Sequence, residues 1–154
     1  MYRFNTGGSG GTSRPDPEGG ARALAIALGV GYEAALHELE TARALALNGW
    51  AQFDRTGLSL VVFDDVMRRY GWVWSAAPRF PDRRARVRDL PCAQIVIARQ
   101  AQHFVAVVHG VSNDTMDCTA KMVYGYWHRS TGFRARVPSQ DRRVSKHGNG
   151  FLNY

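Results

Sequence analysis

Apolar residues change their spacing near the middle of the chain. Up to Tyr70 they recur at the three- and four-residue intervals of a helix, and from Trp72 onward they form short runs rich in Val, Tyr and Trp. The first pattern predicts three helices, over residues 17–28, 32–47 and 58–70. The second predicts strands over 72–74, 94–99 and 122–127, a hairpin over 103–117 and a short strand over 2–5. Helices followed by strands imply an α+β fold in which an antiparallel sheet packs against the first helix.

The first predicted helix is small and apolar on nearly all sides apart from Arg22, so we expect it to be central and packed on several faces. Asp16-Pro17 is a typical helix start, because the Asp side chain caps free amides and Pro fits the first helical position. Gly19 and Gly20 are unusual in such a helix, since each costs up to about 1 kcal/mol relative to Ala. A requirement other than helix propensity must therefore account for these two glycines.

The predicted hairpin, HFVAVVHGVSNDTMD, contains a His109-Gly110 dipeptide where a two-residue turn would fall. With such a turn, Val108 faces Val111 across the two strands. The period of two then places one set of side chains on a common face: His103, Val105, Val107, Ser112, Asp114 and Met116.

His103 and Asp114 become diagonal neighbours in this register. A carboxylate there would hold the imidazole in one tautomer and stabilise its cation, which is the orienting role in a nucleophile, base and acid arrangement. The hairpin therefore predicts two members of a catalytic site and lacks the nucleophile.

The formal net charge of +7 comes from 20 basic and 13 acidic residues, and most of the basic ones are Arg. Such a surface favours phosphate or acidic partners, and the Arg-rich segment 78–89 and the basic tail are the places where nucleic acid would bind. Pro and Asp interrupt the 78–89 segment, and its basic residues leave no aromatic stacking series. We therefore interpret it first as a solvated loop.

The length indicates one domain over residues 1–130, which opens with a Gly-rich loop over 1–16. The basic tail, 131–154, is polar, poorly periodic and expected to be disordered in part. No apolar run approaches the roughly 18 residues of a membrane span, and no signal peptide is recognisable. Two cysteines, Cys92 and Cys118, are too few for a disulfide framework, so we expect a soluble protein of the cytoplasm.

Cofactor sites are not expected. The Gly-rich loop lacks the Gly-Lys-Ser/Thr ending of a nucleotide-binding loop. Five residues of metal-binding types are close in sequence: His103, His109, Asp114, Asp117 and Cys118. They have no CxxC or HxxxH spacing, and the turn carries His109 too far from His103 to share one ion, so no metal is expected either.

Three blocks of the chain together resemble small phage and prophage proteins of the papain-like cysteine-peptidase family. The first block is Phe4-Asn5-Thr6-Gly7-Gly8, which matches FN-x-GG. The second, EGGARALAIALG from Glu18 to Gly29, matches a helix start of the type DC-x-x-RALA-x-A-x-G. The third is the hairpin that begins at His103, followed by the aromatic segment VYGYW. The blocks span most of the chain and leave its middle and its tail unmatched.

The resemblance implies a thiol in the first turn of a central helix, a histidine that exchanges protons with it, and an Asp or Asn that orients the histidine. Mapped onto this chain, His103 is the base and Asp114 its orienter, with Asp117 as the substitute if the hairpin register slips by one residue. Gly19 occupies the nucleophile position and has no side chain that could attack a carbonyl. Cys92 and Cys118 do not replace it, because neither lies at a helix start.

The resemblance therefore implies a phage protein whose ancestral activity is thiol-dependent hydrolysis of a peptide or isopeptide amide, and which is inactive as written. It would be either a natural pseudoenzyme or a deliberately inactivated enzyme. One alternative is a non-catalytic module that binds a host protein in the host cytoplasm, for example to counter a host defence. A second alternative is nucleic-acid binding through the Arg-rich loop and tail. Asn5, Thr12 and Ser13 are equally open as polar groups that could hold an oxyanion.

Overall fold

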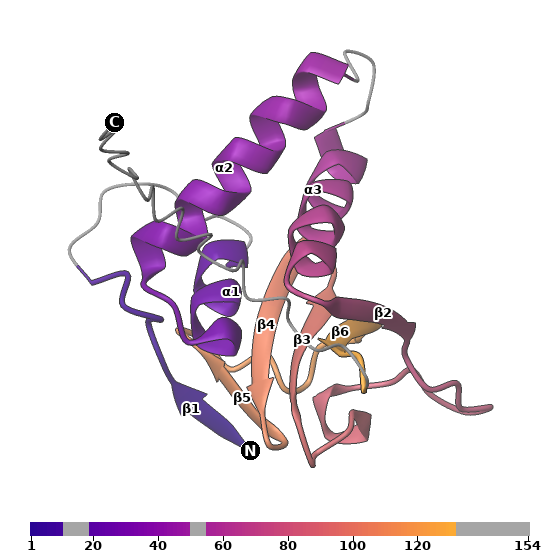
Figure 1. Cartoon of the computed structure of the whole chain (residues 1–154). Helices are drawn as coiled ribbons and strands as arrows, with labels where there is room; N and C mark the ends of the chain where they lie inside the picture. The colour runs from indigo at the N-terminus through magenta and orange to yellow at the C-terminus, as the bar shows by residue number, and fades with distance from the viewer. Residues whose placement is uncertain (11–18, 50–54, 132–154) are drawn as a thin grey trace, which may run out of the picture.

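Three helices lie on one face of a six-stranded sheet in the computed structural model, which describes residues 1–10, 19–49 and 55–131 (Figure 1). The helices are α1 (Gly20–Leu28), α2 (Tyr32–Gly49) and α3 (Arg55–Arg69). The strands are β1 (Tyr2–Phe4), β2 (Trp72–Ala76), β3 (Ile95–Gln100), β4 (His103–Val108), β5 (Val111–Asp114) and β6 (Gly125–Arg129). A single 3-10 turn is described over Val87–Asp89. The α+β class expected from the sequence is confirmed.

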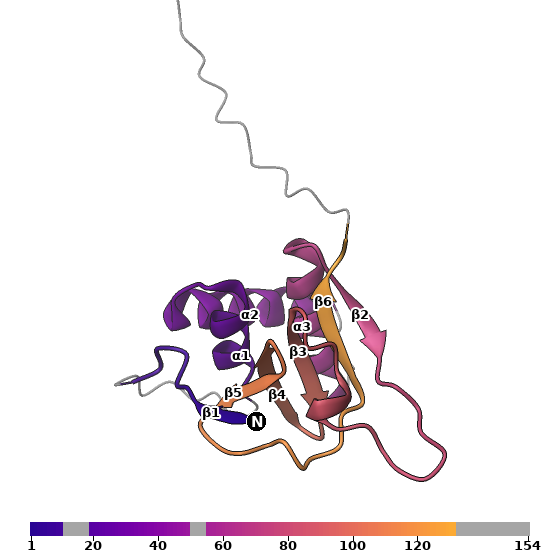
Figure 2. The same ribbon diagram turned by 90° about the horizontal axis from the view of Figure 1, so that it is seen from below.

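The strand order is β1-β5-β4-β3-β6-β2, with β1 and β2 at opposite edges of the sheet (Figure 2). All neighbouring strands are antiparallel except β1, which runs parallel to β5. The sheet is therefore mixed, and the prediction of a wholly antiparallel sheet is wrong at this edge. A parallel pair needs a long connection between its strands, and most of the domain lies between β1 and β5 in the sequence.

Both faces of the central strands are buried. On the helix side, Phe104 of β4 stacks on Phe63 of α3 with ring centroids 4.1 Å apart, and Trp127 of β6 lies 4.9 Å from Phe63. On the other face, alternate residues of β3 and β4 pack against the segment around the 3-10 turn and against Val123. A strand covered on both faces needs no polar positions, which explains why the sequence of β4 alternates poorly.

The first helix has the central place that its composition predicts, since it packs against α2 and lies over β4 (Figure 1). It begins later than expected, at Gly20, with Gly19 as its N-cap in the left-handed conformation (φ 69°). The predicted cap Asp16 and the predicted first helical residue Pro17 lie outside the described residues. At its other end Gly29 is also left-handed, and its N–H donates to the carbonyl of Ala25.

The hairpin forms in the predicted register, with Val108 opposite Val111. His109 and Gly110 both have positive φ (48° and 79°), as a two-residue turn between twisted strands requires. The last strand begins at Gly125 rather than at residue 122 and ends at Arg129, two residues beyond the predicted end of the strand. The expectations for residues 11–16 and for most of the tail, 132–154, lie outside the described residues.

No helix in the described ranges is both long and apolar enough to span a membrane.

Candidate functional site

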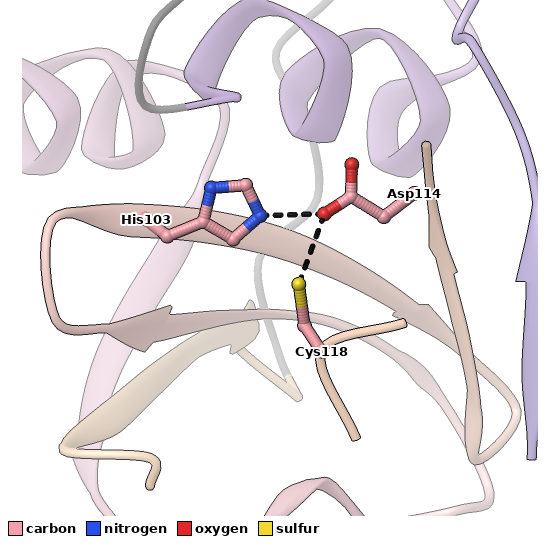
Figure 3. A group of neighbouring side chains, drawn as sticks. All are labelled: His103, Asp114 and Cys118. Carbon is pink, nitrogen blue, oxygen red and sulfur yellow. Dashed lines mark hydrogen bonds and ion pairs between the residues drawn. The ribbon is translucent and has the colours of Figure 1, made fainter. Parts of the chain in front are cut away.

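His103 and Asp114 meet where two neighbouring strands have their ends. His103 is the first residue of β4 and Asp114 the last of β5, and His103 Nε2 lies 2.5 Å from Asp114 Oδ2 (Figure 3). The side chain of Asp114 is 1% exposed and that of His103 10% exposed. The pair expected from strand periodicity is thus present and buried.

Both oxygens of Asp114 have partners. Oδ1 accepts hydrogen bonds from Arg22 Nη1 at 2.8 Å and from the Thr115 amide at 2.7 Å, while Oδ2 faces His103 and Cys118. Burial by itself raises the pKa of this carboxyl, but the hydrogen bonds from His103 and Thr115 and the charges of His103 and Arg22 outweigh it and lower the pKa below its usual 3.8. Asp114 is therefore a carboxylate at neutral pH.

The ionised state of Asp114 decides how the imidazole is protonated. A carboxylate can only accept, so the proton between the two side chains belongs to His103 Nε2. Its other nitrogen, Nδ1, is left to exchange protons with a reacting group. In Figure 3 this second nitrogen points away from Asp114, toward the side where α1 lies.

Gly19 lies against the imidazole. A Cβ atom added to Gly19 would be 2.8 Å from His103 Cε1, 3.0 Å from the carbonyl oxygen of Phe104 and 3.4 Å from Arg22 Nη1. Residue 19 is therefore next to His103 at the start of α1, which is where the papain-like resemblance predicts a nucleophile. Glycine fits this place because its backbone is left-handed and because any Cβ would force His103 to move.

Asp117, the alternative orienter, does not contact His103. Its Oδ1 accepts hydrogen bonds from the amide of Thr119 at 2.9 Å and from the hydroxyl of Thr119 at 2.6 Å, and the residue is exposed. The hairpin has not slipped, so Asp114 is the carboxylate beside the imidazole.

Arg22 and Cys118 complete the cluster, and the sequence assigned a role to neither. Arg22 is the charged residue of an otherwise apolar helix, and a charge in such a place indicates a buried partner. Cys118 is fully buried, and its Sγ lies 3.5 Å from Asp114 Oδ2. Burial, then the charge of Asp114 and their hydrogen bond, raise the pKa of the Cys118 thiol to about 11, so it is not a thiolate nucleophile at neutral pH. Cys92 is exposed and apart from this cluster.

Of the three residues considered for an oxyanion hole, only Asn5 lies in the described part of the chain. Its Nδ2 donates to Asn113 Oδ1 at 3.1 Å, and its Oδ1 accepts from the Gly7 amide at 2.9 Å. These contacts hold the N-terminal loop against β5. Thr12 and Ser13 lie outside the described residues.

Of the five residues considered as metal ligands, three lie together in the structure and two do not. His103, Asp114 and Cys118 each present a ligand atom within 4.8 Å of the others, whereas His109 is exposed at the hairpin turn and Asp117 is bound to Thr119. The sequence argument against a site made with His109 holds, but it did not foresee that Cys118 would join the pair.

Comparison of the chain with protein-family models, with curated proteins and with solved structures gave no match. The papain-like resemblance of the three sequence blocks stays a prediction.

Proposed function

We propose that the protein is a derivative of a papain-like cysteine hydrolase of phage origin, in which the base and its orienter are present and the nucleophile is missing. The observation that carries this proposal is the position of Gly19, at the start of α1 and against the ring of His103, whose far nitrogen is held by Asp114. As written, the chain does not cleave amides by the thiol route. Its ancestral substrate is a peptide or isopeptide bond.

The chemistry of the proposal follows from the contacts. A cysteine at position 19 would lie at the N-terminus of a helix and beside an imidazole, and both favour the thiolate. The thiolate would attack the amide carbonyl, and His103, protonated by the thiol, would pass its proton to the leaving amine. Asp114 would keep the imidazole oriented and stabilise its cation, as its hydrogen bond at 2.5 Å allows.

The test is to install Gly19→Cys in a Cys92→Ser background and to measure labelling by a peptide-like, thiol-directed electrophile. Removing the exposed Cys92 leaves Cys118 as the other thiol, which is fully buried. We expect rapid labelling at residue 19, located by peptide mapping, and a loss of at least about 100-fold when His103→Ala is added.

Gly19→Ala is the matched control, because it adds the same Cβ without the thiol. A non-glycine residue in the left-handed region costs roughly 1–2 kcal/mol, so both variants should lose this much stability or shift the start of α1. A folded Gly19→Cys protein that reacts no faster than an ordinary exposed thiol, or that reacts equally well without His103, would refute the proposal.

A non-catalytic binding module is the second candidate. The observation that favours it is that glycine fits position 19 without strain, so the site is well formed without a nucleophile. Its ligand would be a host protein or peptide bound over the same site. A folded Gly19→Cys variant without His103-dependent reactivity would favour this candidate over the first.

Nucleic-acid binding is the third candidate, and the Arg-rich loop is the feature that bears on it. Arg79, Arg83 and Arg84 line one hollow with Phe80 and Tyr124. Arg83 is already engaged, because it forms two contacts with the carboxylate of Asp89, at 2.6 and 2.8 Å, and its guanidinium lies 3.9 Å from the centre of the Phe80 ring. Binding that weakens steeply as salt rises would support this candidate, and no binding at low salt would remove it.

A further inference from the structure

Three different metal-ligand side chains converge at one buried point of the site. They are His103 from the start of β4, Asp114 from the end of β5 and Cys118 from the loop that follows, and all three residues are buried (Figure 3). Their ligand atoms lie within 4.8 Å of one another, and within the described ranges no other group of three His, Cys, Asp or Glu residues does so.

One of the ligand distances already matches that of a tetrahedral zinc site. Ligand bonds of about 2.0–2.3 Å place neighbouring ligand atoms roughly 3.3–3.5 Å apart. Cys118 Sγ and Asp114 Oδ2 are already 3.5 Å apart. His103 Nε2 and Asp114 Oδ2, now 2.5 Å apart, would have to separate by about 1 Å, and the imidazole would have to make this movement because Arg22 and the Thr115 amide hold the carboxylate.

The second oxygen of Asp114, Oδ1, is held by hydrogen bonds that would orient the carboxylate as a metal ligand. Arg22 and the Thr115 amide both donate to Asp114 Oδ1, so Oδ2 is directed to His103 and Cys118. Hydrogen bonds of this kind orient metal ligands and are part of most metal sites. With Cys118 as a thiolate, two negative charges face the +2 of the ion and the +1 of Arg22, whose side chain is 15% exposed and keeps part of its hydration.

We propose that His103, Asp114 and Cys118 form a binding site for one zinc-like divalent cation. The ion takes His103 Nε2, Asp114 Oδ2 and Cys118 Sγ as ligands, and its fourth position is filled by water or by a ligand from outside. On binding, the Cys118 proton is released to solvent, and the proton on His103 Nε2 is released or moves to Nδ1. The site shares His103 and Asp114 with the proposed acid–base pair, but it does not use residue 19 and so does not rest on the proposed hydrolase ancestry.

Cobalt is the probe that tests this site, because Co²⁺ substitutes for Zn²⁺ and a cobalt–thiolate bond gives a charge-transfer band. The chain has two cysteines, so the experiment uses the Cys92→Ser protein, in which any such band must come from Cys118. After treatment with a chelator, the protein is titrated with Co²⁺ and then with Zn²⁺. We expect one cobalt per chain with a thiolate band, and displacement of the cobalt by zinc.

A matched pair of histidine variants tests whether His103 is the second ligand. His103→Gln should weaken cobalt binding at least about tenfold, whereas His109→Gln, which changes the exposed histidine of the same hairpin, should leave it unchanged. Circular dichroism of each variant shows that it is folded. A folded Cys92→Ser protein that gives no thiolate band up to millimolar cobalt, or a band that His103→Gln and His109→Gln weaken equally, would overturn the proposal. Neither outcome bears on the labelling of Gly19→Cys.

Discussion

Replacing Asp114 with asparagine should destabilise the fold strongly, although the two side chains have nearly the same size. The carboxylate accepts hydrogen bonds from Arg22, Thr115 and His103 and is 1% exposed. Asparagine keeps one acceptor oxygen, removes the negative charge and places an N–H₂ donor where one of the present donors points. The Arg22 guanidinium would then face a neutral group in a nearly dry site.

The magnitude follows from the burial of the ion pair. Removing one partner of a buried ion pair costs about 3–5 kcal/mol, because the remaining charge loses a close contact that offset its desolvation. The Arg22 side chain is still 15% exposed and retains some hydration, so we expect the lower end, about 3 kcal/mol. With a urea dependence of about 1–3 kcal/mol per molar, the unfolding midpoint should fall by about 1–3 M.

Urea unfolding followed by circular dichroism at neutral pH measures this change, and Asp117→Asn is the matched control. Asp117 is exposed and close to Asp114 in sequence, so its replacement should change the free energy of unfolding by less than about 0.5 kcal/mol. A loss below about 1 kcal/mol for Asp114→Asn, or equal losses for the two variants, would refute the reasoning.

The difference between wild type and Asp114→Asn should also depend on pH. Because the pKa of Asp114 is lowered in the folded protein, its stabilising contribution is fully present above its unfolded value of 3.8 and is lost as the pH falls through the folded value. The difference should therefore persist from neutral pH to about pH 4 and close at lower pH. A difference that closes between pH 5 and 7 would point to another group.

Two further changes test the surroundings of the site and the packing of the sheet edge. Since the pKa of Cys118 is raised from 9.0 to about 11, the folded protein holds the thiol proton more tightly than the unfolded chain does. In urea titrations between about pH 9 and 11, wild type should therefore lose more stability than Cys118→Ala. Gly125→Ala should lower the melting temperature, because its Cβ would overlap the ring of Trp74 and overpacking costs about 1–3 kcal/mol. Gly10→Ala is the control, because a Cβ there has open space around it, and it should leave the melting temperature unchanged.

The elements of the fold that have local causes were predictable from the sequence. The turn at His109-Gly110 specifies its own hairpin, and the register of that hairpin follows from the turn length. The parallel pairing of β1 with β5 was not predictable, because it joins Tyr2 to Ser112 across the length of the domain with no local signal. The start of α1 was placed too early because Asp16-Pro17 is a strong helix signal, whereas the left-handed backbone of Gly19 depends on tertiary packing.

Within the site, too, only the contacts that have a local sequence signal were predictable. Strand periodicity relates His103 to Asp114, so their proximity could be inferred from residue spacing alone. Arg22 approaches from a helix and Cys118 from an irregular loop, and no spacing rule connects either of them to the hairpin. Their places depend on how α1 and the loop after β5 pack over the ends of the strands.

The buried polar cluster around Asp114 contributes little net free energy of folding, so stability alone does not explain it. Burying a carboxylate, a guanidinium and an imidazole together gains little over apolar residues of the same volume, since desolvation offsets most of the attraction. Such a network indicates a site that handles protons, a ligand or an ion. His103 is the residue on which these possibilities meet, because its Nε2 can be bonded to Asp114 or to a cation, but not to both. When Nε2 is hydrogen-bonded to Asp114, the imidazole can act as a base toward position 19. When Nε2 binds a metal ion instead, His103 is one ligand of the ion and Asp114 is another. The proposed acid–base pair and the proposed metal site would therefore be mutually exclusive states of one set of side chains.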